Sequence, residues 1–526
     1  MAIVGIIGTL LVSVPQYALA FIATYVALYT AYQVFLHPLS KYPGPFWAKL
    51  SDAYGGFYAN KKCVHLVTRQ NQLEYGPVIR QGPNKLVFCS VSALRDIYNN
   101  PRITKPKAYI ALGPGMPVPN VFTAADKHFH RTRRQLISQI LTDRSLHKLE
   151  PVMTERVDIF LDRLSESARA SCPVNMSQLT RRLTMDIAGL LGFGFDLNLQ
   201  RSDENSFILT ILDAMVPKSN LFYHFFTLRR CIRWLSVMFS GRMREKYMSL
   251  MEKIVSTRMA ESKDARHDLY SVVADVLDAE TGGLRQSELW AEANFFLTAA
   301  GETSKTAICA TLFYLSRNPE PYQKLATEIR TSFTSGTAIH STALNGCRYL
   351  RACIDEALRM SPPAPGILWR EEAPGDHDHE PLVIDGHVIP PGVVFGVSMY
   401  CLHHNEEYFP DSFTYNPDRW LQPETQKAKM VREAFAPFSV GPRACPGKSM
   451  AYQETNLVIA KMLWYFDFQV APGNMGQVGA GAPDLGKGRE RAAEFQLYDV
   501  FNASHDGPYL TLTPRGNGVE AGRVVS

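Results

Sequence analysis

The sequence lacks the patterns that mark several large classes of protein. Its nine cysteines are irregularly spaced and include no Cys-x-x-Cys pair, which indicates reduced thiols in a cytosol-facing protein and no disulfide framework. Its net charge of +5 is small for 526 residues, and no basic run is interleaved with aromatic residues. We therefore expect no nucleic-acid partner.

Cofactor signatures built on glycine or on clustered ligands are also missing. The glycine-rich stretch 189–194 lacks the third glycine of a dinucleotide fingerprint, and the stretch 473–488 has no strand–turn–helix around it. The sequence therefore predicts no nicotinamide or flavin site. His377-Asp-His379 and His403-His404 have no further ligands at metal spacing, and we expect neither to bind a metal ion.

Charged side chains are absent from Met1 to Phe35. Tyr17–Phe35 alone is nearly long enough to cross a bilayer, for which about 20 apolar residues suffice. A signal peptide cleaved after Ala20 is the alternative, but no lysine or arginine precedes the apolar run, and the run continues well past that point. We predict a single-pass transmembrane anchor over residues 1–36.

The segment after the anchor predicts the side of the membrane on which the rest of the chain lies. It carries four lysines against one acid: Lys41, Lys49, Lys61 and Lys62, with Asp52. By the positive-inside tendency, the body over residues 47–526 should face the cytosol. Three prolines and a glycine, Pro38, Pro43, Gly44 and Pro45, predict a stiff, non-helical hinge over 37–46.

One cysteine lies in an unusual setting, in the stretch Phe438-Ser-Val-Gly-Pro-Arg443-Ala-Cys445-Pro446-Gly447. A helix predicted over Lys448–Phe466 follows, so Cys445 lies at a helix N-terminus, where the macrodipole favours a negative sulfur. Pro446 would take the first helical position, and Arg443 would place a cation beside the thiol. Such a thiolate can bind a soft or borderline metal, haem iron among them, but a buried structural cysteine at a helix cap shows the same pattern.

The longest helical pattern runs from Ser287 to Arg317 and is apolar on most sides, so we expect it to be buried and to cross the whole domain. Its centre, Ala299-Ala-Gly-Glu302-Thr303-Ser304, is rich in small and polar residues. The Thr303 hydroxyl can donate to the Ala299 carbonyl and loosen the turn, which would leave room for a ligand and supply groups for proton delivery. Close packing of the small residues against another helix is the alternative.

Two pairs of polar residues are spaced to share a helix face. His130 and Arg134 are four residues apart in the basic segment Asp126–Leu141, and Glu356 and Arg359 are three apart. Alone, the first pair would be part of a solvated face and the second a weak exposed ion pair.

Most of the remaining chain, including residues 145–275, has helical patterns. Leu382–Ile384 and His387–Ile389 flank Asp385-Gly386 and predict a β-hairpin. The predicted fold class is mainly α with a small β-rich part.

These patterns resemble those of the cytochrome P450 family. The Cys445 stretch matches all five fixed positions of the family's haem-binding loop, Phe-x-x-Gly-x-Arg-x-Cys-x-Gly. The segment 299–304 resembles the oxygen-activating motif Ala-Gly-x-Glu-Thr-Thr, with Ala300 in place of the glycine and Ser304 in place of the second threonine.

Two further motifs follow in the family's order and spacing, so the resemblance covers about residues 37–515. Glu356-Ala-Leu-Arg359 resembles Glu-x-x-Arg, and Tyr415-Asn-Pro-Asp-Arg419-Trp resembles Phe-x-Pro-x-Arg-Trp, with tyrosine for phenylalanine. The resemblance implies that Glu356, Arg359 and Arg419 form a structural network behind the haem.

The resemblance implies haem b, iron protoporphyrin IX, as the cofactor and Cys445 as the axial ligand of its iron. The other cofactor-binding residues would come from the same loop, from the long helix and from the propionate-binding positions: Phe438, Arg443, Gly447, Ala299, His130, Arg134 and Arg370. His130 replaces the tryptophan of the family's Trp-x-x-x-Arg pattern, which weakens its expected role. Thr303, with Glu302, would relay protons.

The implied activity is that of a haem–thiolate monooxygenase, an oxidoreductase that inserts one atom of O₂ into a lipophilic small molecule by hydroxylation or epoxidation. Electrons would come from NADPH–cytochrome P450 reductase, with cytochrome b5 as a second donor, at the endoplasmic reticulum membrane. The sequence looks like fungal microsomal members that act on secondary-metabolite intermediates. The alternatives are a haem–thiolate isomerase or dehydratase that needs no reductase, and a non-catalytic haem-binding protein.

Overall fold

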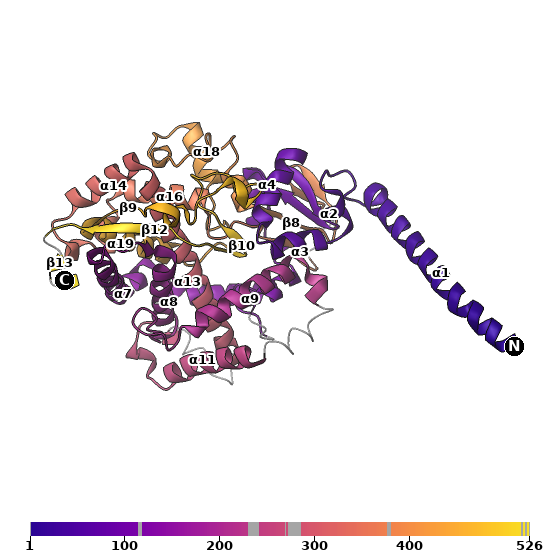
Figure 1. The fold of residues 1–526 in the computed structure, drawn as a ribbon, viewed down its shortest axis with the longest axis horizontal. Helices are drawn as coiled ribbons and strands as arrows, with labels where there is room; N and C mark the ends of the chain where they lie inside the picture. Colours follow the sequence, from indigo (N-terminus) through magenta and orange to yellow (C-terminus); the bar gives the residue numbers. More distant parts are fainter. Residues whose placement is uncertain are drawn as a thin grey trace.

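The computed structural model describes residues 2–113, 118–229, 241–268, 270–271, 286–375 and 380–516, and the short strands 519–520 and 523–524. One long helix projects from one end of a mostly helical body, and the chain's C-terminal strands lie at the opposite end (Figure 1). The helices are α1 (Ala2–Ala31), α2 (Phe46–Leu50), α3 (Ala53–Asn60), α4 (Val64–Tyr75), α5 (Val91–Tyr98), α6 (Lys127–Ile140), α7 (Asp143–Arg169), α8 (Met176–Phe193), α9 (Phe207–His224), α11 (Gly241–Met259), α13 (Gln286–Arg317), α14 (Pro319–Ser332), α15 (Ser341–Leu344), α16 (Arg348–Met360), α17 (Met399–His403), α18 (Gln426–Ala434) and α19 (Lys448–Tyr465).

In the described residues, the β-structure forms small sheets, as the sequence predicted. The largest has five strands in the order β1 (Val78–Gly82), β2 (Lys85–Phe88), β8 (Val394–Val397), β5 (Arg370–Glu372) and β3 (Ile103–Thr104). A second sheet orders β4 (Val174–Asn175), β12 (Tyr509–Pro514) and β9 (Phe466–Val470). Two-stranded sheets pair β6 (Leu382–Ile384) with β7 (His387–Ile389), β10 (Tyr498–Val500) with β11 (Asn502–Ser504), and β13 (Val519–Glu520) with β14 (Arg523–Val524).

The hairpin β6–β7 has the predicted bounds, and its turn explains why. Asp385 and Gly386 have φ of 51° and 74°, the left-handed conformation that a two-residue hairpin turn requires at both positions. In the five-stranded sheet, β2 and β8 run parallel with Leu86 opposite Phe395. That pairing joins segments about 300 residues apart, which no local sequence pattern indicates.

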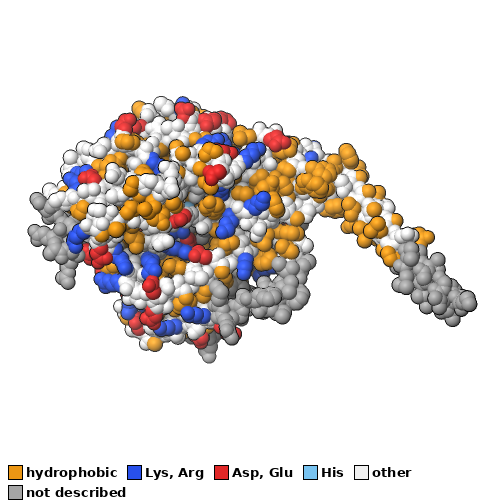
Figure 2. All heavy atoms as spheres, in the orientation of Figure 1, with side chains coloured by type: hydrophobic (Ala, Val, Ile, Leu, Met, Phe, Trp, Pro, Cys, Tyr) orange, Lys and Arg blue, Asp and Glu red, His pale blue; other side chains and the backbone are white. Residues whose placement is uncertain are grey.

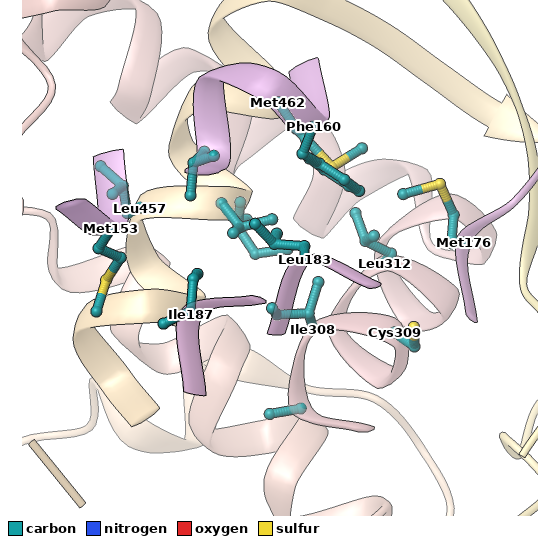
Figure 3. Close-up of a cluster of buried hydrophobic side chains, with 14 of the residues drawn as sticks. Met153, Phe160, Met176, Leu183, Ile187, Ile308, Cys309, Leu312, Leu457 and Met462 are labelled. Atoms are coloured by element: carbon teal, nitrogen blue, oxygen red, sulfur yellow. The ribbon is translucent and has the colours of Figure 1, made fainter. Parts of the chain in front are cut away.

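Helix α13 crosses the centre of the body and packs closely against α8. Figure 3 shows Ile308 and Leu312 of α13 meeting Leu183 and Ile187 of α8, with side chains of α7 and α19 around them. A Cβ atom at Gly301 would lie 2.3 Å from the Met185 sulfur of α8, so a larger residue would require the Met185 side chain to move. Part of the small-residue segment in α13 therefore serves helix packing, the alternative left open by the sequence.

Two predicted helix ends need correction or qualification. Helix α19 begins at Lys448 with Gly447 as its N-cap, so Pro446 precedes the helix and does not take its first position. The apolar segment Pro15–Leu36 spans 22 residues with most of its side chains exposed, and it is long and apolar enough to cross a membrane. It consists of the end of α1 and one turn of π-helix over Tyr32–Leu36.

Candidate active site

A cavity of about 310 Å³ lies against α13, between α6, α9 and the loop that precedes α19. Its walls are mainly apolar, with side chains such as Leu212, Met215, Phe295 and Phe501. The structure brings to this cavity every cofactor-binding residue predicted from the sequence, together with Thr303: Ala299, His130, Arg134, Arg370, Phe438, Arg443, Cys445 and Gly447. Glu302 is not among the lining residues.

The Cys445 loop is held in a fixed shape. The Cys445 backbone N–H donates to the Phe438 carbonyl at 2.8 Å, and Gly441 adopts φ of 78°. A Cβ atom at Gly441 would lie 2.0 Å from the Tyr98 carbonyl oxygen, so a glycine is required there. The Cys445 side chain is accessible from the cavity, although protein surrounds it on its other sides.

The charges around the Cys445 sulfur differ from those expected. Burial raises the pKa of the Cys445 thiol, and the Gly447 N–H, Arg134 and Lys448 act in the opposite direction. Arg443, the cation predicted to act on the thiol, instead donates to the carbonyls of Ala124 and Ala125 at 2.5 and 3.1 Å. Burial thus favours the neutral thiol, and a metal ion bound to the sulfur would favour the thiolate.

Four cations gather on one side of the cavity, around His130. Arg134 donates to the Ala444 carbonyl at 2.5 Å, and Arg370 donates to the Tyr109 hydroxyl at 2.9 Å. Burial and the four neighbouring cations lower the pKa of His130 to about 3, so its imidazole is neutral and can donate one N–H. The fourth is Lys105, which is buried and donates to the Phe122 carbonyl. Burial and the three arginines lower the pKa of the Lys105 ammonium well below its usual value, so a bound anion would favour its charged form.

Sequence reasoning missed Lys105 because no motif surrounds it and only its burial reveals it. In the described part of the chain, none of the four cations Lys105, Arg134, Arg370 and Arg443 forms an ion pair with an acidic side chain. Lys105 and Arg370 are buried, and Arg134 and Arg443 are partly buried. Clustered basic side chains in such a setting favour an anionic ligand. A group with two carboxylates and a metal that binds a thiolate, such as the predicted haem, fits this arrangement.

Thr303 and Glu302 are adjacent in sequence but face different surroundings. The Thr303 hydroxyl donates to the Ala299 carbonyl at 2.6 Å, as predicted, and borders the cavity. The Glu302 carboxylate instead accepts from Arg181 Nε at 2.6 Å and from Lys305 Nζ at 2.9 Å. Burial alone would raise the pKa of Glu302, but Lys305 and Arg181 outweigh it and lower the pKa to about 2. Glu302 is thus ionised, paired and turned away from the cavity.

A different acid lies behind the cavity wall. Glu454 of α19 is 1% exposed, and its carboxyl interacts with the hydroxyl of Ser304, which lines the cavity. Burial raises the pKa of Glu454 to about 8, and its Oε1 atom has no hydrogen-bond partner. Glu454 therefore carries a proton at neutral pH. A lone acid within an apolar helix was the signal in the sequence that could have indicated it.

The predicted ion network forms away from the cavity. Arg359 donates to both carboxylate oxygens of Glu356 at 2.9 Å, and Arg419 donates to one of them at 2.9 Å. Arg359 also donates to the His403 and Ser412 carbonyls, at 2.9 and 2.7 Å. These bonds connect α16 to the end of α17 and to the segment that follows it.

Of the two histidine pairs, the structure describes His403-His404, and both rings contact backbone groups. His403 Nε2 accepts from the Ala436 N–H at 3.1 Å, and His404 Nδ1 lies 2.9 Å from the Tyr400 carbonyl. No group of three or more potential ligands from His, Cys, Asp and Glu occurs in the described part of the chain. His377 and His379 lie outside the described residues.

A family model and curated relatives both match most of this chain. The family model for cytochrome P450 matches residues 45–480. Cytochrome P450 monooxygenase AKT7 of Alternaria alternata is 31% identical over 93% of this chain and 96% of its own length. The cytochrome P450 monooxygenases apf7 of Gibberella fujikuroi and poxM of Penicillium oxalicum are 31% and 33% identical, over 92% and 94% of this chain and 95% and 93% of their own lengths.

Proposed function

Because this chain belongs to the cytochrome P450 family, and so is a haem-dependent monooxygenase, we propose that its cavity binds haem b with Cys445 as the axial ligand of the iron. The observation that supports this proposal most strongly is that Cys445 and four basic side chains, none of them ion-paired with an acid in the described residues, line the same cavity. The two propionates would be bound by the four basic side chains Arg134, Arg370, Arg443 and Lys105. Neutral His130 would donate one hydrogen bond to a propionate.

The bound haem supplies the activation of O₂, in which two electrons and two protons convert one oxygen atom to water while the other enters the substrate. The protein must then deliver protons into an apolar cavity. The Thr303 hydroxyl, anchored on the Ala299 carbonyl, can hold a water molecule at the cavity wall. We assign the proton store to Glu454, whose carboxyl proton can pass to the cavity through the Ser304 hydroxyl.

We infer a structural role for Glu302. Its carboxylate joins α13 to Arg181 of α8, and its low pKa leaves it without a proton to give at neutral pH. This assignment departs from the relay role that the sequence motif implied.

The substrate we propose is a lipophilic small molecule, hydroxylated at a C–H bond or epoxidised at a C=C bond. The apolar and aromatic cavity walls support this class. An intermediate of secondary metabolism is the specific proposal, supported by the likeness to fungal family members. The electrons would come from NADPH through cytochrome P450 reductase, with cytochrome b5 as a second donor.

We also propose that the segment Pro15–Leu36 anchors the enzyme in the endoplasmic reticulum membrane, with the body in the cytosol. The length of this exposed apolar segment and the lysines that follow it support this location.

The test of the function uses the haem-loaded protein with reductase and NADPH. Lipophilic compounds are first screened for a shift of the haem Soret band, and those that bind are incubated with isotopically labelled dioxygen. We expect one labelled oxygen atom in the product and a strict requirement for NADPH. Conversion of a bound compound without NADPH would instead support the isomerase or dehydratase alternative.

A further inference from the structure

The segment between α1 and the body is packed against the body. Leu39 and Tyr42 are buried, at 0% and 3% exposure, and Gln33 at the end of the apolar segment is 6% exposed. The direction in which α1 leaves the body is therefore set by contacts and not by a free linker.

The central contact is a buried arginine. Arg80 of β1 is 0% exposed and donates to both the backbone carbonyl and the side-chain Oε1 of Gln33, at 2.7 and 2.6 Å. The Arg80 side chain also donates to the Pro83 carbonyl at 2.8 Å, and the Arg80 backbone N–H donates to the Pro43 carbonyl at 2.7 Å. No carboxylate pairs with Arg80 among the residues that the structure describes. Its charge instead faces the C-terminal end of the apolar helix, where the helix dipole is negative.

Two further hydrogen bonds hold the same junction. The Tyr29 hydroxyl donates to the Leu50 carbonyl at 3.0 Å, which ties α1 to α2. His37 Nε2 and Asn84 Oδ1 are 3.0 Å apart, which ties the segment to the turn between β1 and β2. With the Arg80 contacts, these bonds fix the helix at several separate points.

An exposed aromatic surface lies beside this junction. Phe46 and Trp47 of α2 are 49% and 71% exposed, and Phe57 of α3 is 54% exposed. Figure 2 shows apolar side chains at the base of the projecting helix and on the adjoining part of the body. The Lys61 ammonium lies 4.5 Å from the centre of the Phe57 ring. Aromatic residues with nearby lysines are typical of the headgroup region of a membrane.

We propose that Arg80 fixes the angle between α1 and the body, so that the phospholipid bilayer that holds α1 also receives Phe46, Trp47 and Phe57 in its headgroup region. The proposal rests on the membrane anchoring of the apolar segment proposed above. It has a consequence for the cavity, because α3 packs on α9, with Gly55 and Gly56 against His224 and Phe225, and Leu212 and Met215 of α9 line the cavity. The aromatic surface would then be linked through α3 and α9 to the site that takes lipophilic compounds.

The experiment uses the full-length haem-loaded protein in vesicles of phosphatidylcholine with a minor fraction of phosphatidylserine. Lipids brominated either near the headgroup or near the end of the acyl chain quench tryptophan fluorescence at those depths. The difference in quenching between wild type and Trp47→Phe isolates Trp47. We expect strong quenching of Trp47 by the shallow lipid and weak quenching by the deep one.

Arg80→Leu should abolish the shallow quenching of Trp47 while the protein stays on the vesicles, and Gln33→Leu, a milder change, should weaken it. The ferrous CO spectrum of each variant reports whether the body is folded. Arg330→Leu is the control, because Arg330 also donates to carbonyls at a helix end, those of Leu463 and Phe466 at 3.0 and 3.2 Å, and in addition pairs with Asp467. It should leave Trp47 quenching unchanged.

The outcomes separate this inference from the anchoring on which it rests. Two results would overturn the role of Arg80 and leave the membrane anchor in place. One is vesicle-bound wild type in which Trp47 is not quenched, and the other is full quenching of Trp47 in folded Arg80→Leu. Protein that does not bind the vesicles at all would overturn both.

Discussion

At the scale of single residues, Cys445 carries the assignment of the cofactor. Replacing its sulfur removes the thiolate that shifts the haem absorption, so Cys445→Ser should lose the strongly red-shifted Soret band of the ferrous CO complex. Cys172→Ser, at an exposed cysteine outside the cavity, should keep the band. Survival of the band in folded Cys445→Ser would mean that another residue is the axial ligand.

Thr303 can be tested against a threonine with the same local bond. Thr303→Ala should keep haem loading and substrate binding but lose proton delivery, so NADPH is consumed and peroxide leaves in place of product. General acid–base help of this kind is about 10²–10⁴-fold. The measurement is the ratio of product formed to NADPH oxidised, with peroxide assayed alongside.

Thr311→Ala is the control for this test. The Thr311 hydroxyl donates to the Ala307 carbonyl at 2.8 Å in the same helix, but Thr311 does not line the cavity. Its coupling ratio should match that of wild type. Unchanged coupling in Thr303→Ala would reduce Thr303 to a packing residue.

The two buried acids give opposite predictions. Glu454→Gln removes the stored proton and should lower coupling. Glu302→Gln should leave coupling near wild type and lower the free energy of unfolding by about 3–5 kcal/mol, because Lys305 loses its buried carboxylate partner, although Arg181 keeps its ion pair with Asp213. The pKa of Glu302 falls from 4.5 to about 2 on folding, so its stabilising effect is complete above pH 4.5 and is lost as the pH falls towards 2.

The pH dependence of coupling distinguishes the two acids. The pKa of Glu454 rises from 4.5 to about 8, so in the folded protein its proton is present below pH 8 and lost above it. Coupling in wild type should therefore decline as the pH rises through about 8, and the decline should be absent in Glu454→Gln. A decline that disappears in Glu302→Gln would reverse the assignment.

At the scale of elements, α13 serves the cavity with one face and helix packing with another. Gly301→Ala places a methyl group 2.3 Å from the Met185 sulfur in a closed core, so we expect a loss of about 1–3 kcal/mol in the free energy of unfolding. Gly192→Ala in α8 is the control, since its Cβ atom would meet only Phe296, at 3.8 Å. It should be neutral or stabilising by up to about 1 kcal/mol. Equal effects in thermal unfolding would contradict the packing role.

At the scale of the whole molecule, the anchor and the body are separable except at their junction. Deleting residues 2–28 or 2–36 should release the body from membranes while haem binding persists. Only the longer deletion removes Gln33, whose carbonyl and Oε1 accept from buried Arg80. The free energy of unfolding of that variant should be lower by about 1–3 kcal/mol than that of the shorter deletion. Membrane pelleting and thermal unfolding measure the two effects. If the protein is expressed with its full sequence and recovered in the secreted fraction, cleaved after Ala20, the anchor is contradicted.

The sequence by itself determined the family, its haem cofactor and most of the local structure. The fixed spacing of Cys445, Arg443 and Gly447, and the back-bond of Thr303 to Ala299, depend on a few consecutive residues, so local rules suffice to predict them. The hairpin at Asp385-Gly386 and the long central helix follow for the same reason.

Tertiary structure alone decided which side chains meet. Glu302 and Thr303 are neighbours in the chain, but the position of α8 places Arg181 beside Glu302 and turns it from the cavity. The placement of Lys105 with the other cations, of Glu454 behind Ser304 and of Arg80 on Gln33 depends on contacts between distant segments. Such contacts arise when whole helices and sheets pack together. A short sequence pattern predicts only which face of its own helix or strand a residue occupies, and not which residues of other elements that face meets.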